Sequence, residues 1–373
     1  MKKIKKNTPN FLKYLLAGIY ITSKCIFRGF INKKNIVLNM AGVLPPIDSH
    51  QIVHGGKVKL LHLRERFGDS WKKFNISYFV SSGLPFFPYL WIKIYKMFGI
   101  KVVWNQNGVA YNAIYTNEVV KSINNLMKPI HSVDYVVYQT KFCKKSADKY
   151  LGIFNGPSSI VLNPVDVNEF TPRKSPLPKE PLILIMTGNH MESKERLIAS
   201  IGTIKELHNK GIKTKLIILG NLPKAGFVTE EDIDTEIKKQ NLEEWVEKKG
   251  GFLQKDAPAL FQSAHILLHL KYLDPCPTVV LEALASGLPV VASLSGGLPE
   301  MVDEKSGILI PIVEDFEKLH YPSVKEVADA IEKISSNLDE WSKNARLGAV
   351  QKFDNKVWLN RHEELFKEIL NIK

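Results

Sequence analysis

A proline-rich stretch divides this sequence into two halves that share one kind of pattern. Five prolines fall within the eighteen residues from 164 to 181: Pro164, Pro172, Pro176, Pro178 and Pro181. Proline fixes φ and has no N–H donor, so this stretch is incompatible with a regular helix or a central strand. A chain of 373 residues is long enough for two domains. We therefore expect a first domain at residues 35–170, a linker at 171–181 and a second domain at 182–355.

Short apolar runs alternate with helical patterns in both halves. Those of the first half predict strands at 35–40, 76–80, 101–104, 134–139 and 160–162, and helices at 58–67, 88–98 and 141–151. Those of the second half predict strands at 182–186, 215–219, 266–270 and 290–293, and helices at 194–210, 230–240, 257–263, 278–286, 324–335 and 338–353. Such alternation is typical of parallel, doubly wound sheets. We therefore predict an α/β protein with two Rossmann-like domains, and a final amphipathic helix at 356–373 that crosses back to the first domain.

The N-terminal arm, residues 1–34, carries much of the positive charge of a chain whose net charge is +13. The first 47 residues contain no Asp or Glu, and all nine of their Lys and Arg residues lie in this arm. Its apolar run at 11–27 is interrupted by Lys13 and Lys24 and is shorter than the ~20 residues a spanning helix needs. We expect a basic amphipathic helix on an anionic membrane surface, which places the protein in the cytoplasm at the inner face of the membrane. The alternative is a helix packed on the first domain.

Other classes of function lack a sequence signal. The three cysteines, Cys25, Cys143 and Cys276, form no CxxC pair, and the histidines form no HExxH cluster. Neither a disulfide framework nor a metal site is therefore expected. The net charge also suits nucleic acid, but no helix-turn-helix, RNA-recognition or zinc-finger pattern accompanies it, so no nucleic-acid partner is expected.

The segment from residue 274 to 300 carries the strongest functional signal. Asp274 follows a predicted strand, and Glu282 lies in the first turns of the next predicted helix. Two prolines between them delay the helix and leave the amides of Thr278 and Val279 free at its positive end, where phosphate or sugar oxygens bind. Each carboxylate can accept two hydroxyl hydrogen bonds. This pattern predicts a polyol-phosphate site, and the alternative makes Asp274 a cap-like residue and Glu282 a surface residue.

A pair of glycines, Gly296 and Gly297, comes one predicted strand later. They follow the strand at 290–293 and precede Pro299, which suits the first turn of a helix. Glycines at such a place let backbone amides approach a phosphate closely. A second phosphate-binding loop is therefore predicted beside the acid pair.

Together these residues resemble the donor-binding signature of family 4 retaining glycosyltransferases, which have the GT-B fold. The likeness is strongest where residues 282–291 read Glu-Ala-Leu-Ala-Ser-Gly-Leu-Pro-Val-Val. Residues 163–170 resemble the interdomain turn of that family, and residues 188–194 resemble its phosphate loop. The resemblance implies two Rossmann-like domains facing each other across a cleft, and a metal-independent reaction with a nucleotide diphosphate sugar as co-substrate and no other cofactor.

The resemblance also implies roles for individual residues. Glu282 would hold the ribose hydroxyls, and Asp274 would hold sugar hydroxyls with help from the amides near Thr278 and Val279. Lys194 would neutralise the diphosphate as its charge grows in the transition state. Gly296 and Gly297 would approach the diphosphate. The remaining implied donor-binding residues are Gly55, Gly56, Gly188, Asn189 and Arg196 around the phosphates, and Phe252 and Leu253 near the base.

Three positions depart from the pattern of that family. Asp274 replaces the usual Glu and is one methylene shorter, and Asn189 replaces an Arg whose charge Arg196 could restore. Residues 105–107, Asn-Gln-Asn, stand where many relatives have a His. We therefore assign no general base, because the departing phosphate oxygen can take the acceptor proton.

The function expected is the transfer of a hexose or N-acetylhexosamine to a glycan or lipid-linked acceptor of a cell-envelope polysaccharide. Two alternatives remain open. One is a nucleotide-sugar epimerase of the same fold, and the other is a catalytically weak protein that binds a nucleotide sugar.

Overall fold

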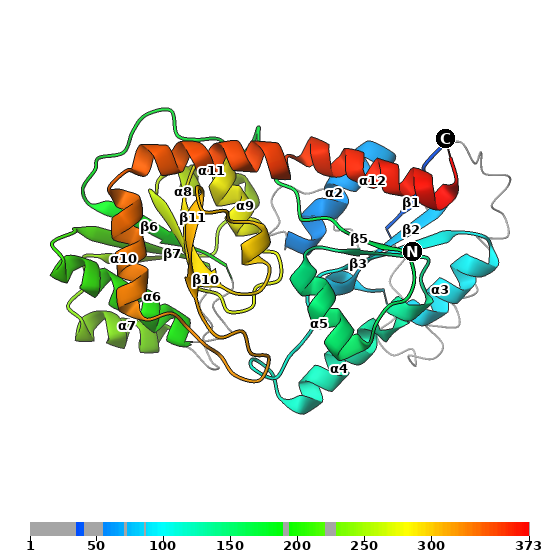
Figure 1. Ribbon diagram of the computed structural model, residues 1–373, viewed down its shortest axis with the longest axis horizontal. Helices are drawn as coiled ribbons and strands as arrows, with labels where there is room; N and C mark the ends of the chain where they lie inside the picture. Colours follow the sequence, from blue (N-terminus) through cyan, green and yellow to red (C-terminus); the bar gives the residue numbers. More distant parts are fainter. Residues whose placement is uncertain are drawn as a thin grey trace, which may run out of the picture.

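The computed structural model describes residues 35–40, 55–70, 73–85, 87–188, 194–220 and 229–372. The expected arm at 1–34 and Asn189 of the phosphate loop lie outside these residues. The described chain forms two parallel β-sheets, each flanked by helices (Figure 1). The α/β class and the division into two Rossmann-like halves are thus confirmed.

The first sheet has five parallel strands in the order β1-β2-β3-β4-β5. They are β1 (Leu38–Asn39), β2 (Ile76–Val80), β3 (Lys101–Gln106), β4 (Tyr135–Tyr138) and β5 (Ser158–Ile160). Its helices are α2 (Gly55–Phe67), α3 (Pro88–Met97), α4 (Asn117–Met127) and α5 (Lys141–Leu151). Successive strand side chains point to opposite faces, so Val102 and Trp104 join one apolar core while Val103 joins the other.

The second sheet has six parallel strands in the order β11-β10-β9-β6-β7-β8. They are β6 (Leu182–Met186), β7 (Thr214–Leu219), β8 (Val246–Gly250), β9 (Ile266–His269), β10 (Val290–Leu294) and β11 (Gly307–Pro311). Its helices are α6 (Lys194–Asn209), α7 (Glu230–Lys239), α8 (Ala257–Gln262), α9 (Thr278–Ala285), α10 (Val324–Ser335) and α11 (Leu338–Phe353). The chain reverses its direction across the sheet between β6 and β9. Ligands of such sheets bind beyond the carboxyl ends of the strands at this switch point.

The last helix, α12 (Asn355–Leu370), continues from α11 but packs on the first sheet (Figure 1). Trp358, Leu365 and Phe366 are buried in the same apolar cluster as β1 and β2. Arg66 of α2 also pairs with Glu363 of α12 at 2.7 Å. The end of the chain therefore ties the two halves together.

The turn between the domains is held by the helices that follow the second sheet. Arg346 of α11 donates to the carbonyl oxygens of Val167, Phe170 and Ala285. Val165 donates its amide to the carbonyl of Phe353 at 2.9 Å. A single guanidinium on α11 therefore binds three backbone carbonyls, two of the turn and one at the end of α9.

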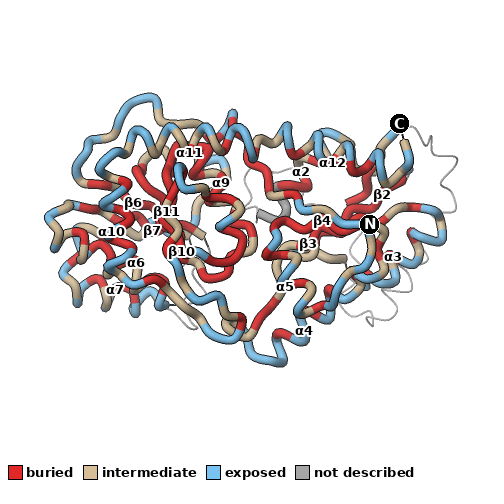
Figure 2. The backbone as a smooth tube through the Cα atoms, viewed as in Figure 1, coloured by how far each residue is buried: buried red, intermediate tan, exposed pale blue. Residues whose placement is uncertain are grey.

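Among the described α-helices and β-strands, α4, β8 and β11 were not predicted from the sequence. The two strands are the edges of the second sheet, and β8 is largely polar because only one neighbour covers it. Helix α4 buries only Val120, Asn124 and Met127, so its apolar pattern is sparse. Figure 2 shows the contrast between the buried central strands and the exposed outer sides of the helices. Among the described residues, no helix is both long and apolar enough to cross a bilayer.

Candidate active site

Asp274 lies in the loop after β9, at the switch point of the second sheet. The carboxylate is buried, and its Oδ2 atom lies 3.6 Å from Nζ of Lys271 and 3.3 Å from Nε2 of His269. Burial opposes ionisation of this carboxyl, but the charge of Lys271 and the contact with His269 outweigh it and hold the pKa of Asp274 well below its ordinary value. Asp274 is therefore an anion at neutral pH.

His269 at the end of β9 is neutral beside that anion. Its ring is buried, and burial lowers its pKa more than Asp274 raises it. Neither ring nitrogen makes a hydrogen bond of acceptable geometry to the described residues. Lys271, whose side chain is 24% exposed, therefore supplies the positive charge next to Asp274.

Glu282 occupies a different environment on α9. Its Oε1 accepts a hydrogen bond of 3.2 Å from Nε2 of Gln254, and no cation is paired with it among the described residues. Burial, with a smaller contribution from the charge of Glu169, raises the pKa of Glu282 to about 7. In the described part of the chain, the amides of Thr278 and Val279 at the start of α9 donate to no protein oxygen, as the two prolines before them predicted.

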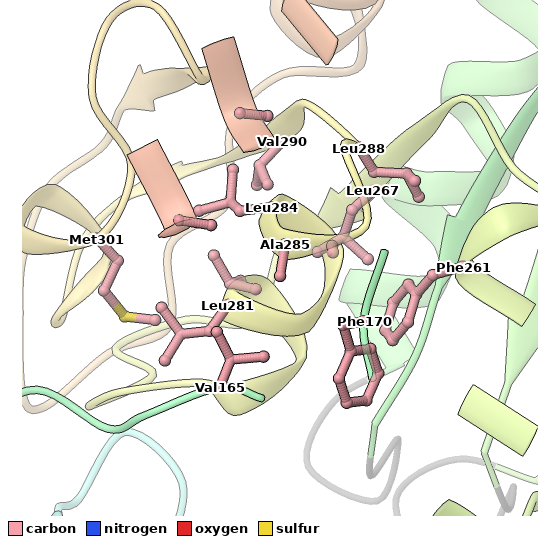
Figure 3. Close-up of a cluster of buried hydrophobic side chains, with 14 of the residues drawn as sticks. Val165, Phe170, Phe261, Leu267, Leu281, Leu284, Ala285, Leu288, Val290 and Met301 are labelled. Atoms are coloured by element: carbon pink, nitrogen blue, oxygen red, sulfur yellow. The ribbon is translucent and has the colours of Figure 1, made fainter. Parts of the chain in front are cut away.

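Glu282 and Thr278 line a cavity of about 180 Å³ between the two domains. The cavity combines polar groups with an apolar wall. The other lining residues include Lys59, His62, Asn163, Glu169, Phe170 and Gln254. Helix α9 is anchored by an apolar cluster, in which its residues Leu281, Leu284 and Ala285 pack with Val165 and Phe170 of the interdomain turn (Figure 3). This packing fixes the direction in which Glu282 points.

Gly296 and Gly297 lie directly against the Asp274 loop. A Cβ atom at Gly297 would lie 2.0 Å from the carbonyl oxygen of Pro275, and one at Gly296 would lie 2.5 Å from that of Asp274. The Gly297 amide donates to Asp274 O at 2.9 Å, and the Gly296 amide donates to the Glu314 carboxylate at 3.3 Å. These glycines are therefore required by close packing, and a diphosphate at Gly296 would have to replace Glu314.

The expected cationic residues lie at the start of α6. Lys194 is its first residue and is exposed, whereas Arg196 is buried and donates to the Thr187 carbonyl at 3.1 Å. The charge of Arg196 also helps to lower the pKa of Asp274. Gly188 adopts a φ of 118°, which favours glycine, directly after Thr187 at the end of β6.

The remaining predicted residues lie on both sides of the domain junction. Phe252 and Leu253 are half-buried and directly precede Gln254, the partner of Glu282. Gly55 and Gly56 are the first two residues of α2. Phe252 packs against the apolar cluster that contains Leu281 and Leu284 of α9. Asn189 lies outside the described residues.

The first domain touches the Asp274 loop directly. Thr140 Oγ1 donates to Pro275 O at 2.9 Å, and Asn163 Nδ2 donates to Cys276 O at 3.0 Å. Glu300 of the second domain accepts from the amides of Lys141 and Phe142 at the start of α5. The loop that carries Asp274 thus lies between the two domains.

Several polar residues of this site were not predicted. Lys59, Gln254, His269 and Lys271 surround the two acids but belong to no pattern in the sequence that marks a site. The one available signal was the position of His269 and Lys271 at the carboxyl end of a strand, just before the predicted loop acid. Among the described residues, no group of His, Cys, Asp and Glu side chains could hold a metal ion.

Comparison with known proteins connects this geometry to a family. Residues 167–348 match the glycosyl transferases group 1 family. The matched range contains both acids and the whole second sheet, and nearly all of the first domain lies outside it.

Solved structures share the fold over most of the chain. Sucrose-phosphate synthase of Thermosynechococcus elongatus is 16% identical, with a TM-score of 0.62 over 85% of this chain and 77% of that one.

A second solved structure, HepE of Anabaena in complex with UDP, is 16% identical, with a TM-score of 0.61 over 84% of this chain and 82% of that one. At these identities the likeness establishes the fold, which is the GT-B arrangement.

Among curated proteins, the putative colanic acid biosynthesis glycosyltransferase WcaL of Escherichia coli is 31% identical over 154 residues, 39% of this chain. One subunit of the human phosphatidylinositol N-acetylglucosaminyltransferase is 28% identical over 175 residues, 47% of this chain. The chain spans 36% and 33% of the length of these two relatives.

Proposed function

We propose that this protein is a retaining glycosyltransferase of family 4 that moves a sugar from a nucleotide diphosphate donor to a glycan or lipid-linked acceptor. The observation that carries the proposal is the pair of acids, Asp274 and Glu282, which flank the unpaired amides of Thr278 and Val279 at the switch point. Such a site offers anionic acceptors for hydroxyl groups and N–H donors for oxygen atoms within one loop and helix.

The two acids suit different parts of the donor. Asp274 is already ionised, and it accepts hydrogen bonds from hydroxyls of the transferred sugar. Glu282 lines the cavity between the domains, and it accepts from the ribose hydroxyls there. Phe252 and Leu253, the two residues before Gln254, then lie beside the base.

The reaction requires no protein base in this proposal. The bond between C1 of the sugar and the diphosphate oxygen breaks as a bond from C1 to the acceptor oxygen forms on the same face. The acceptor proton passes to the departing phosphate oxygen. Lys194 and Arg196 at the start of α6 stabilise the negative charge that develops on the diphosphate, and the reaction uses no metal.

The biological setting follows from the relatives and the charge. WcaL is described as a colanic acid biosynthesis enzyme, which supports a role in an envelope polysaccharide. The basic arm supports a location in the cytoplasm, on the inner face of an anionic membrane. A chain lacking residues 2–34 should no longer sediment with vesicles that contain anionic lipid, and unchanged sedimentation would contradict this location.

A thermal-shift screen with nucleotide sugars tests the donor proposal. A ligand that binds only the folded state raises the melting temperature, and the Glu282→Ala variant should lose that shift. Incubation of the hit with acceptor lipid and NMR of the product would then assign the anomeric configuration. An inverted configuration would contradict the retaining mechanism, and isomerised free nucleotide sugar would favour an epimerase.

A further inference from the structure

Lys59 of α2 is buried at the carboxyl edge of the first sheet, where it contacts amides instead of acids. Its Nζ donates to Asn105 Oδ1 at 2.6 Å, to Asn107 Oδ1 at 3.1 Å and to Asn163 Oδ1 at 3.4 Å. The side chain is 1% exposed, and burial lowers its pKa to about 7. An ammonium or a neutral amine can both donate to Asn105 and Asn107, so these contacts do not depend on the protonation state of Lys59.

These contacts determine which way the amide of Asn107 points. Lys59 Nζ donates in either protonation state, so the Asn107 atom that faces it is assigned as the carbonyl oxygen. Gln139 Nε2 donates to the same oxygen at 2.8 Å. The Nδ2 group of Asn107 is thereby turned away from Lys59. One of its hydrogens is donated to Ser82 Oγ at 2.8 Å, and the described residues provide no acceptor for the other.

The unused donor lies at the junction with the second domain. Asn107 is half-buried, and the next residue, Gly108, lies so close to the donor loop that a Cβ atom there would be 3.1 Å from Cγ of Pro275. Asn163, the third acceptor of Lys59, also bonds to Cys276 of that loop. The amide network of the first domain and the Asp274 loop are therefore adjacent.

We propose that Lys59 and Gln139 hold Asn107 as a hydrogen-bond donor to a hydroxyl oxygen of the transferred sugar. Asn107 contacts the substrate, and Lys59 and Gln139 are positioning residues that do not. This inference rests on the proposed function, because it places the sugar next to Asp274. It also adds a role for the first domain, which the family match does not cover.

The first test requires no ligand. Asn107→Asp places a carboxylate against Lys59, so in the wild-type background it should leave the melting temperature unchanged or raise it. In a Lys59→Met background the same carboxylate has lost its cation, and the melting temperature should fall by about 2–4 °C more. Equal changes in the two backgrounds would show that Lys59 does not face Asn107, and would overturn the proposal.

The second test separates the sugar from the nucleotide by calorimetric titration with UDP, UDP-glucose and UDP-N-acetylglucosamine. Asn107→Asp has a folded structure by the first test but cannot donate, so it should weaken nucleotide-sugar binding about tenfold while changing UDP binding less than about twofold. Lys59→Met and Gln139→Met should act in the same direction. Asn125→Ala, an exposed asparagine on α4, is the matched control and should change neither affinity.

The outcomes distinguish this proposal from the proposed function. Equal weakening of UDP and of the nucleotide sugars would mean that Asn107 supports the fold of the site only, and unchanged binding of both would mean that it does not contact the sugar. Either result overturns the inference and leaves the donor site intact. If none of the three probes binds the wild-type protein, the donor does not carry uridine diphosphate, and the melting-temperature cycle still decides whether Lys59 positions Asn107.

Discussion

Asp274 is buried and Glu282 is half-buried, and their surroundings shift the pKa values of these two acids in opposite directions. Asp274 has Lys271 and His269 beside it, and its pKa is lowered. Glu282 has the neutral amide of Gln254 and the distant charge of Glu169, and its pKa is raised to about 7. Burial alone disfavours both charges, so the difference comes from the positive charges of Lys271 and Arg196 near Asp274, whereas no described cation is paired with Glu282.

The two acids therefore differ in their ionisation before any ligand binds. Asp274 is ionised in the absence of substrate, so in the proposed function it would offer the sugar hydroxyls a preorganised acceptor. Glu282 lies at the cavity without a described cation, so it is the hydroxyls of a bound nucleotide that would stabilise its charge. Substitutions at the two acids test the contrast between them, and a substitution at Lys194 tests the neighbouring phosphate site. The predicted effects on activity or stability are largest for Asp274→Asn and smallest for Glu282→Gln.

Asp274→Asn should have the largest effect on catalysis. The amide keeps the shape but loses the charge and half of the acceptor capacity, so transfer should fall about 100-fold or more. Initial rates with a donor from the thermal-shift screen provide the measurement. Activity within about threefold of wild type would remove Asp274 from the site.

The same variant should also lose stability. Asp274→Asn removes the anionic partner of Lys271 and His269, and we expect the free energy of unfolding at pH 7 to fall by about 2 kcal/mol. Because folding lowers the pKa of Asp274, its contribution to stability is fully present above the ordinary Asp pKa and is lost as the pH falls from there through the much lower pKa of the folded state. Urea unfolding at pH 7 and at about pH 2 should therefore show a smaller difference between the two proteins at the lower pH. A gain in stability at pH 7 would refute the pairing.

Glu282→Ala and Lys194→Ala should each lower activity at least about tenfold, which corresponds to ~1.4 kcal/mol. In the proposed function, Glu282→Ala would remove the contact with the ribose hydroxyls, and Lys194→Ala would remove charge stabilisation of the diphosphate. Lys205→Ala, later on α6, is a control for the loss of a lysine from that helix. Full activity of both site variants would disprove the assignment of these residues.

Glu282→Gln should have the smallest effect, and its sign should be opposite to that of Asp274→Asn. The folded state raises the pKa of Glu282, so its contribution to stability is present below about pH 4.5 and is lost as the pH rises through about 7. The uncharged variant should therefore be more stable than wild type at pH 8 by about 1 kcal/mol, with little difference at pH 4.5. Thermal unfolding at both pH values checks this, and a variant less stable at pH 8 would refute the environment assigned to Glu282.

Periodicity and proline spacing were enough to predict most of the fold. The central strands β2 and β6 and the helices α5, α10 and α11 have the bounds that their apolar patterns indicate, because two-sided burial leaves a continuous signal. The edge strand β8 (Val246–Gly250) was missed because an edge strand buries less and tolerates polar residues. The other missed edge strand, β11, is a short apolar run between Gly307 and Pro311, so polarity does not explain why it was missed.

The candidate site was less predictable. Asp274 and Glu282 follow from a loop and a helix that are adjacent in sequence. Lys59, in contrast, sits in a helix where lysine usually faces solvent, and it is buried only because residues 105, 107 and 163 converge around it. Contacts of this kind depend on how separate segments pack, and spacing along the chain does not encode them.

The most direct test of the contrast between the two acids is proton release when a nucleotide binds. Calorimetric titration with UDP at pH 7, in two buffers of different ionisation enthalpy, measures the protons exchanged. If hydroxyls of the ligand stabilise the charge of Glu282, the wild-type protein should release about half a proton more than Glu282→Gln does, because its carboxyl is about half protonated at that pH. Equal proton exchange by the two proteins would contradict the account.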